Sequence, residues 1–213
     1  MRAVIFDLWD TLVEWPVDDA EVLRERIAAL VGLDDDEFGR RWSDSYRPSQ
    51  TGPLADAYRA LGVPDEHVEA EVGARHAFGR LALRPRPGAT AALAALREHD
   101  VRLAVLSVCS EEVPAAWPES ELAGLFDVET FSSECGLMKP EPEIYLQTAA
   151  ALGVEPAECL FVGDGANDEL AGAARVGMTP VHFLPAGTEP LWSHVRDWDG
   201  LSVSALEDVL ALV

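Results

Sequence analysis

The chain begins with MRAVIFDLWDTL, residues 1–12. Within it, Ala3–Phe6 is a short apolar run that stops at the acidic residue Asp7. A run of this length bounded by a polar residue is typical of a buried parallel strand, because such a strand is covered on both faces. Ligands of open α/β sheets bind beyond the carboxyl ends of the strands. Asp7 therefore stands where a functional side chain is expected.

Three later runs have the same character and predict further strands: Val101–Leu106, Leu160–Val162 and Thr179–Phe183. Helical patterns lie between them, such as the alanine- and leucine-rich Ala89–His99, and a weak strand signal follows near Leu201–Val203. Strands that alternate with helices of this length predict a doubly wound, Rossmann-like α/β fold with a parallel sheet.

Residues 15–84 differ from the rest of the chain because they carry helical patterns and no strand signal. Apolar and aromatic residues recur there at helical spacing, as Phe38 and Trp42 do. We therefore predict a small α-helical cap domain over this region, inserted into a core domain formed by residues 1–14 and 85–213.

The chain is strongly acidic, with 38 Asp and Glu against 16 Lys and Arg and a formal net charge of −22. Such a surface repels nucleic acids and anionic lipid headgroups, so DNA, RNA and membrane surfaces are unfavourable partners. We expect a small-molecule substrate instead. Whether the protein is a monomer or a homodimer stays open.

The cysteines do not form a pattern typical of disulfides. Cys109, Cys135 and Cys159 are odd in number and make no C-x-x-C pair, as expected in a reducing compartment. The N-terminal apolar run is too short for a signal peptide, and no stretch approaches the roughly 20 apolar residues of a membrane span. These features predict a cytoplasmic protein.

The ends of three predicted strands and the start of one helix carry polar residues: Asp7, Ser107, Asp164 with Asp168, and Lys139. Carboxylate oxygens suit a divalent cation, and a lysine suits a phosphate anion. A carboxylate in such a place can also act as a covalent nucleophile. The residues therefore favour phosphoryl transfer. Lys139 is the only lysine among the 16 basic residues.

Four segments, in chain order, resemble the four motifs of the haloacid dehalogenase superfamily: FDLWDTL (6–12), VLS (105–107), GLMKP (136–140) and VGDGAND (162–168). The predicted helical cap stands where that superfamily has its helical caps. The resemblance covers about residues 1–185. It implies a hydrolase with a Rossmann-like core.

The resemblance also implies a metal site. A Mg²⁺ ion is expected to be held by the carboxylate of Asp7, the backbone carbonyl of Trp9 and the carboxylate of Asp164, with Asp168 close by. Oxygen ligands of this kind are those that Mg²⁺ prefers.

The same resemblance assigns catalytic roles. Asp7 is expected to attack the substrate and form an aspartyl intermediate, while Ser107 and Lys139 hold the oxygens of the transferred group. Thr11 of the first motif is a candidate substrate-binding residue.

In the cap, Trp42 and Arg47 are candidate substrate-binding residues. The alternative is that Trp42 is a core residue and Arg47 a solvated charge on a helix face.

Trp9 departs from the pattern of the superfamily's phosphatases, which have a second aspartate two residues after the nucleophile to move protons. Trp9 supplies a backbone carbonyl but no proton, and losing a general acid typically costs ~10²–10⁴ in rate. Asp10 is one residue further on, but neighbours in an extended segment point to opposite sides. Trp9 is either a hydrophobic plug under the cap or part of a site for leaving groups that need no proton.

Three functions therefore compete. The leading one is a Mg²⁺-dependent phosphatase or phosphotransferase that acts on a small phosphorylated metabolite. The second is a 2-haloacid dehalogenase, which Trp9 favours because halide leaves without a proton, whereas Asp164 and Asp168 disfavour it. The third is a catalytically impaired member of the superfamily that binds a ligand.

Overall fold

Six parallel strands form one sheet in the computed structural model, which describes residues 1–213. Their order across the sheet is β3-β2-β1-β4-β5-β6. The strands are β1 Ala3–Phe6, β2 Arg102–Ser107, β3 Val128–Phe131, β4 Cys159–Gly163, β5 Thr179–Phe183 and β6 Leu201–Val203. The predicted α/β fold is confirmed. The sequence did not predict β3, because this edge strand is only half buried and includes the exposed Glu129.

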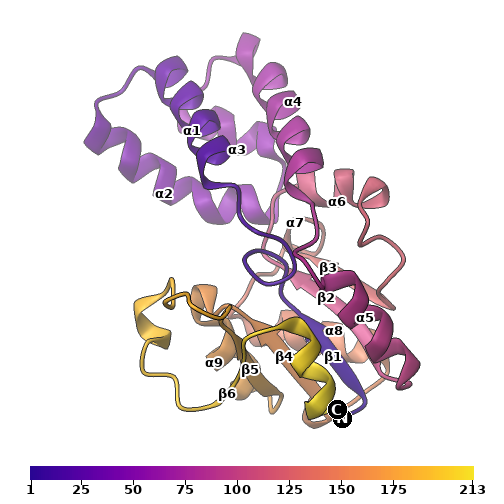
Figure 1. The fold of residues 1–213 in the computed structure, drawn as a ribbon. Helices are drawn as coiled ribbons and strands as arrows, with labels where there is room; N and C mark the ends of the chain where they lie inside the picture. The colour runs from indigo at the N-terminus through magenta and orange to yellow at the C-terminus, as the bar shows by residue number, and fades with distance from the viewer.

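Helices pack on both faces of the sheet, as Figure 1 shows. The helices of this core are α5 Ala89–Glu98, α6 Glu112–Ala116, α7 Ser132–Cys135, α8 Pro142–Leu152 and α9 Glu169–Arg175. Short 3-10 helices complete it: η1 Trp117–Glu119, η2 Pro156–Glu158, η3 Ala166–Asp168, η4 Ser193–Val195 and η5 Leu206–Leu212. None of the helices combines the length and apolar character that a membrane span requires.

The alternation of side chains along β1 explains the two layers. Val4 and Phe6 are completely buried on the face covered by α5 and η5, whereas Ala3 and Ile5 are buried on the face covered by α8 and α9. Because both faces of a parallel strand are covered, its residues are apolar without interruption. β1 therefore lies at the centre of the sheet, between β2 and β4.

Four helices follow β1 and gather at the end of the molecule opposite the two termini (Figure 1). They are α1 Val17–Val31, α2 Asp35–Thr51, α3 Leu54–Leu61 and α4 Asp65–Ala82. They have a small hydrophobic core of their own, separate from the two cores of the sheet. We refer to α1–α4 as the cap.

The cap meets the sheet domain most closely where α4 crosses α6. Gly79 of α4 makes this approach possible, because a Cβ atom there would lie 2.9 Å from the backbone oxygen and Cγ of Glu112. Arg75 of α4 also forms an ion pair with Glu112. These contacts place α4 above the carboxyl ends of the strands, where ligands of this class of fold bind.

Candidate active site

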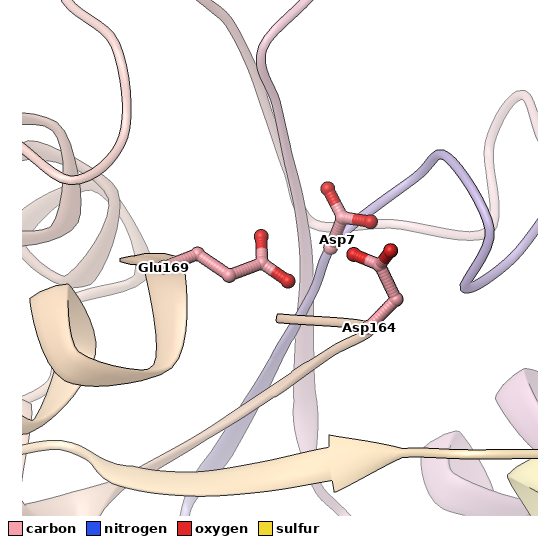
Figure 2. Close-up of side chains that lie close together, drawn as sticks. All are labelled: Asp7, Asp164 and Glu169. Carbon is pink, nitrogen blue, oxygen red and sulfur yellow. The ribbon is translucent and has the colours of Figure 1, made fainter. Parts of the chain in front are cut away.

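The carboxyl ends of the central strands bring three acidic side chains together. Asp7 follows β1, Asp164 follows β4 and Glu169 begins α9. Each offers a carboxylate oxygen, and these oxygens all lie within 4.8 Å of one another. Figure 2 shows the three carboxylates turned toward a common point. All three residues are buried.

Lys139 lies against the same cluster and is itself buried. Its Nζ atom donates to Oδ1 of Asp7 and to Oε2 of Glu169, the latter at 2.5 Å. One ammonium group thus faces three carboxylates. We call Asp7, Asp164, Glu169 and Lys139 the inner cluster.

The pKa values of the inner cluster reflect this crowding of negative charge. Burial, with a contribution from the charge of Asp7, raises the pKa of Asp164 to about 6. The same two causes raise the pKa of Glu169 well above its usual value. Burial alone lowers the pKa of Lys139, but the charges of Asp7 and Glu169 outweigh it and hold that pKa above its usual value. The cluster therefore holds more negative charge than its one ammonium group compensates.

The structure does not bring Asp168, the fourth predicted metal-binding residue, into this cluster. Its side chain is 64% exposed, and its carboxylate lies 3.5 Å from His194. Asn167 and Asp168 both adopt left-handed conformations, with φ of 53° and 55°, and α9 begins directly after them. These two residues turn Glu169, rather than Asp168, toward the inner cluster.

Gly163 makes room for Glu169, and Gly165 binds it. A Cβ atom at Gly163 would lie 2.1 Å from Oε1 of Glu169. The backbone N–H of Gly165 donates to that same oxygen at 3.0 Å. Sequence reasoning missed Glu169 because it follows another acidic residue, and only the local backbone conformation decides which of the two faces inward.

A cavity of about 570 Å³ opens over the inner cluster. The core contributes Asp7, Lys139 and Asp164 to its wall. The cap contributes Tyr46 and Gln50 from α2 and Arg75 from α4, among others. A cavity of this volume, with polar groups gathered at one end, is typical of a small-molecule site.

A family model described as haloacid dehalogenase-like hydrolase matches residues 1–177, which include the inner cluster. This chain belongs to the haloacid dehalogenase-like hydrolases. The sequence-based prediction of the family, and of a hydrolase, is confirmed.

The relatives of this hydrolase include both phosphatases and dehalogenases. The glyceraldehyde 3-phosphate phosphatase of Methanopyrus kandleri is 30% identical over 197 residues, which cover 86% of this chain and 84% of that protein. The (S)-2-haloacid dehalogenase 4A of Burkholderia cepacia is 28% identical over 204 residues, covering 89% and 86% respectively. A solved phosphatase from Thermococcus onnurineus superposes with a TM-score of 0.72 at 22% identity, covering 100% of this chain and 97% of that one.

Trp9 and Asp10 of this hydrolase both line the cavity. The ring of Trp9 packs edge-to-face on Trp15, with ring centroids 4.8 Å apart. Asp10 has a left-handed backbone, with φ of 57°, and its Oδ1 accepts a hydrogen bond from the N–H of Trp15 at 3.0 Å. The expectation that neighbouring residues point to opposite sides assumed an extended segment, and it does not apply to the left-handed backbone at Asp10. Burial raises the pKa of Asp10.

Ser107 and Thr11 are completely buried near the inner cluster's strands. Ser107 is the last residue of β2, and Thr11 belongs to the loop after β1. Their hydroxyl oxygens have no hydrogen-bond partner in the protein. Neither residue is among those that line the 570 Å³ cavity, so their predicted roles in binding stay predictions.

The two predicted cap residues lie away from this cavity. Trp42 packs on Phe38, with ring centroids 5.6 Å apart, and lines a second cavity of about 500 Å³ beside the first. Arg47 is 55% exposed and pairs with Glu141 of the core. The face of α2 that meets the site carries Tyr46 instead, because Arg47 is rotated by about 100° around the helix axis.

The segment after β5 contributes a contact that the sequence did not predict. The indole N–H of Trp192 donates to Oδ2 of Asp164 at 2.6 Å. His194 contacts the carbonyl oxygen of Gly165 at 2.8 Å. A Cβ atom at Gly165 would lie 2.7 Å from Cγ1 of Val195, so the segment packs tightly on the loop that follows β4. Trp192 thus fixes the second oxygen of a buried carboxylate.

Proposed function

We propose that this hydrolase is a Mg²⁺-dependent phosphatase that acts on a small phosphorylated metabolite through an aspartyl intermediate at Asp7. The observation that carries the proposal is the excess of buried carboxylates over ammonium groups in the inner cluster. An uncompensated buried carboxylate is costly, and a divalent cation removes that cost.

The residues fit Mg²⁺ well. The candidate ligands are all carboxylate oxygens, the hard donors that Mg²⁺ prefers. Oδ2 of Asp7 is buried and has no hydrogen-bond partner in the protein, so it is available as a ligand or as a nucleophile. When bound, the ion stabilises the negative charge that develops on the transferred phosphoryl group. Asp7 and Asp164 are the residues that would hold it, and the backbone carbonyl of Trp9 stays a further predicted ligand.

The charge of the inner cluster also separates a phosphatase from a dehalogenase. A 2-haloacid is an anion, and a metal-independent dehalogenase has to bind it without help from a cation. Here, Lys139 is already shared by Asp7 and Glu169, so the cluster repels a carboxylate substrate. Trp9 still favours dehalogenation, because halide leaves without a proton. It does not reduce the repulsion between the inner cluster and a carboxylate substrate.

The proposed chemistry has two steps. A carboxylate oxygen of Asp7 attacks phosphorus, and the bond from phosphorus to the ester oxygen breaks. The leaving oxygen keeps the electron pair and takes up a proton. Water then attacks the aspartyl phosphate, which releases inorganic phosphate and restores the carboxylate. Lys139 donates to Asp7 and is placed to balance charge as the phosphoryl group arrives.

One carboxyl group in the cavity wall is left to supply the proton for the leaving group. Asp10 is the lining carboxyl that belongs neither to the inner cluster nor to the ion pair between Arg75 and Glu112. Esters with good leaving groups need no such proton, so they are the substrates that test the phosphatase proposal most directly.

The test is hydrolysis of p-nitrophenyl phosphate by the purified protein, with Mg²⁺ and after chelation, alongside a halide-release assay with 2-chloropropionate. We expect phosphate release that requires Mg²⁺ and no halide release. Halide release in the absence of metal would show that the protein is a dehalogenase instead. Mg²⁺ binding without turnover of either substrate would favour the impaired binding protein.

A further inference from the structure

Glu112 and Arg75 form the one charged pair that lines the cavity outside the inner cluster. Glu112 begins α6, shortly after β2, and its side chain is 1% exposed. Arg75 comes from α4 of the cap and is 16% exposed. The pair therefore joins the two parts of the molecule at the wall of the candidate active site.

The geometry of this pair leaves one carboxylate oxygen free. Nε of Arg75 donates to Oε1 of Glu112 at 2.9 Å, and Nη2 of Arg75 lies 2.8 Å from the same oxygen. An arginine and a carboxylate usually form two parallel hydrogen bonds that engage both oxygens. Here Oε2 of Glu112 is buried and has no hydrogen-bond partner in the protein.

Only one other carboxylate among the cavity residues has a buried oxygen without a partner, and that is the candidate nucleophile Asp7. Leaving such an oxygen unpaired costs free energy, so its presence at a cavity wall indicates a ligand group that completes it. A pair that served only to hold the cap would be more stable with both oxygens engaged.

The surroundings hold the pair in place. The guanidinium of Arg75 stacks over Trp15 and Phe78, at 5.5 Å and 4.7 Å from the ring centroids. The backbone of Gly79 packs directly on the side chain of Glu112. The carboxylate of Glu112 is therefore held in one position, and selective recognition requires such a rigid group.

Resting on the proposed phosphatase function, we infer that Glu112 and Arg75 select the leaving group, and that the substrates are phosphate monoesters of neutral or amino alcohols. Oε2 of Glu112 accepts a hydrogen bond from a hydroxyl or ammonium group of the alcohol. Since Arg75 is neutralised by Glu112 and Lys139 by the inner cluster, no lining cation is left for a second anionic group. Esters that carry a carboxylate are disfavoured.

The test compares kcat/KM for glycerol 3-phosphate, n-propyl phosphate and 3-phosphoglycerate in the wild-type protein with Mg²⁺. The first carries a neutral hydroxyl group at the position where the third carries a carboxylate, and the second lacks hydroxyls. We expect glycerol 3-phosphate to exceed each of the others by about 10- to 100-fold, as a hydrogen bond to a charged group predicts.

The variant Glu112→Gln removes the charge that neutralises Arg75. We expect the preference for glycerol 3-phosphate over 3-phosphoglycerate to fall by about 10-fold or more. The matched control is Glu111→Gln, because Glu111 also contacts the cap, through Leu54 and His76, but does not line the cavity. Its ratio should equal that of the wild type.

Two results would overturn the inference. One is a wild-type protein that hydrolyses p-nitrophenyl phosphate but uses the three alkyl esters equally well. The other is the same change of ratio in Glu111→Gln as in Glu112→Gln. The wild-type comparison needs no variant, so poor folding of Glu112→Gln does not prevent the test. If even p-nitrophenyl phosphate is not hydrolysed, the proposed function itself fails, and this inference fails with it.

Discussion

The two ends of the cavity differ in charge and in origin. The inner end lies at the carboxyl ends of the central strands, where buried carboxylates outnumber the single ammonium group of Lys139. The outer end is built by both parts of the molecule, where the charges of Arg75 from the cap and Glu112 from α6 of the core balance and Trp15 packs beside Arg75. The inner end therefore carries a net negative charge, whereas the outer end is neutral.

This difference separates the chemistry from the choice of substrate. Under the proposed function, the negatively charged inner cluster binds a metal ion and, through it, a phosphate, whatever alcohol the phosphate carries. A neutral wall with one free acceptor oxygen distinguishes one alcohol from another instead. Changes at the inner end should therefore affect all esters alike, and changes at the outer end should affect some esters more than others.

The largest expected effect is at Asp7. Asp7→Asn should lower turnover of every phosphate ester by about 10⁴-fold or more, as loss of a covalent nucleophile does. Steady-state kinetics on p-nitrophenyl phosphate and glycerol 3-phosphate are the measurement. If the variant lost activity on only one of these esters, the separation between the two ends would be wrong.

Trp9→Asp should act in the opposite direction. A carboxyl group at this position can protonate the leaving oxygen, so turnover of alkyl phosphates should rise by up to ~10²–10⁴-fold while p-nitrophenyl phosphate gains little. The gain will be smaller if the loss of the contact with Trp15 leaves a cavity. An equal change on both types of ester would argue that Trp9 is only a hydrophobic plug. In that case the proton comes from another group, and Asp10 is the proposed source.

The sequence predicted the inner end much better than the outer one. Asp7 and Asp164 each follow a buried parallel strand, and the carboxyl ends of parallel strands lie at the same side of the sheet. Two apolar runs were therefore enough to predict that the two carboxylates lie close together. Lys139 was also placed correctly beside them. Asp168 lies outside the cluster because two consecutive left-handed residues, which no periodicity reveals, turn Glu169 inward instead.

The outer end could not be predicted in the same way. Its residues depend on how the cap helices rotate and where they dock, and helical periodicity alone does not define either. Trp42 was chosen from the correct helix but packs into the small core of the cap. Arg75 and Glu112 meet only because Gly79 lets α4 approach α6 closely.

Glu169 occupies the position in the inner cluster that the sequence assigned to Asp168, and two variants can test this difference. Glu169→Gln should weaken Mg²⁺ binding by about 10- to 100-fold, whether Glu169 binds the ion or only orients its neighbours. Asp168→Asn is the matched control, since its exposed side chain lies outside the cluster, and its Mg²⁺ affinity should stay at the wild-type value. Titration calorimetry compares them. Equal losses in both variants would restore Asp168 as a ligand.

A variant of Trp192 tests whether the segment after β5 also affects the metal affinity of the inner end. Trp192→Phe keeps a ring but removes the N–H that holds Oδ2 of Asp164, so Mg²⁺ affinity should fall by about 10-fold. The control is Trp198→Phe, because the indole of Trp198 donates to the carbonyl of Leu201 and does not line the cavity. If both variants bind Mg²⁺ as the wild type does, the orientation of Asp164 depends on the sheet alone.

The smallest expected effect lies at the contact between the two ends. The hydroxyl of Tyr46 in α2 accepts a hydrogen bond from Asn167 of the core at 3.2 Å, directly over the loop that carries Asp164. Removing it in Tyr46→Phe loses one hydrogen bond of about 1 kcal/mol, which corresponds to roughly a fivefold change. Because this bond joins the cap to the core, we expect KM for glycerol 3-phosphate to rise and kcat to stay unchanged. Tyr58→Phe removes a cap hydroxyl that makes no hydrogen bond to the core and should leave KM unchanged. A fall in kcat without a change in KM would mean that Tyr46 acts on the chemical step, and the outer end would then do more than select the alcohol.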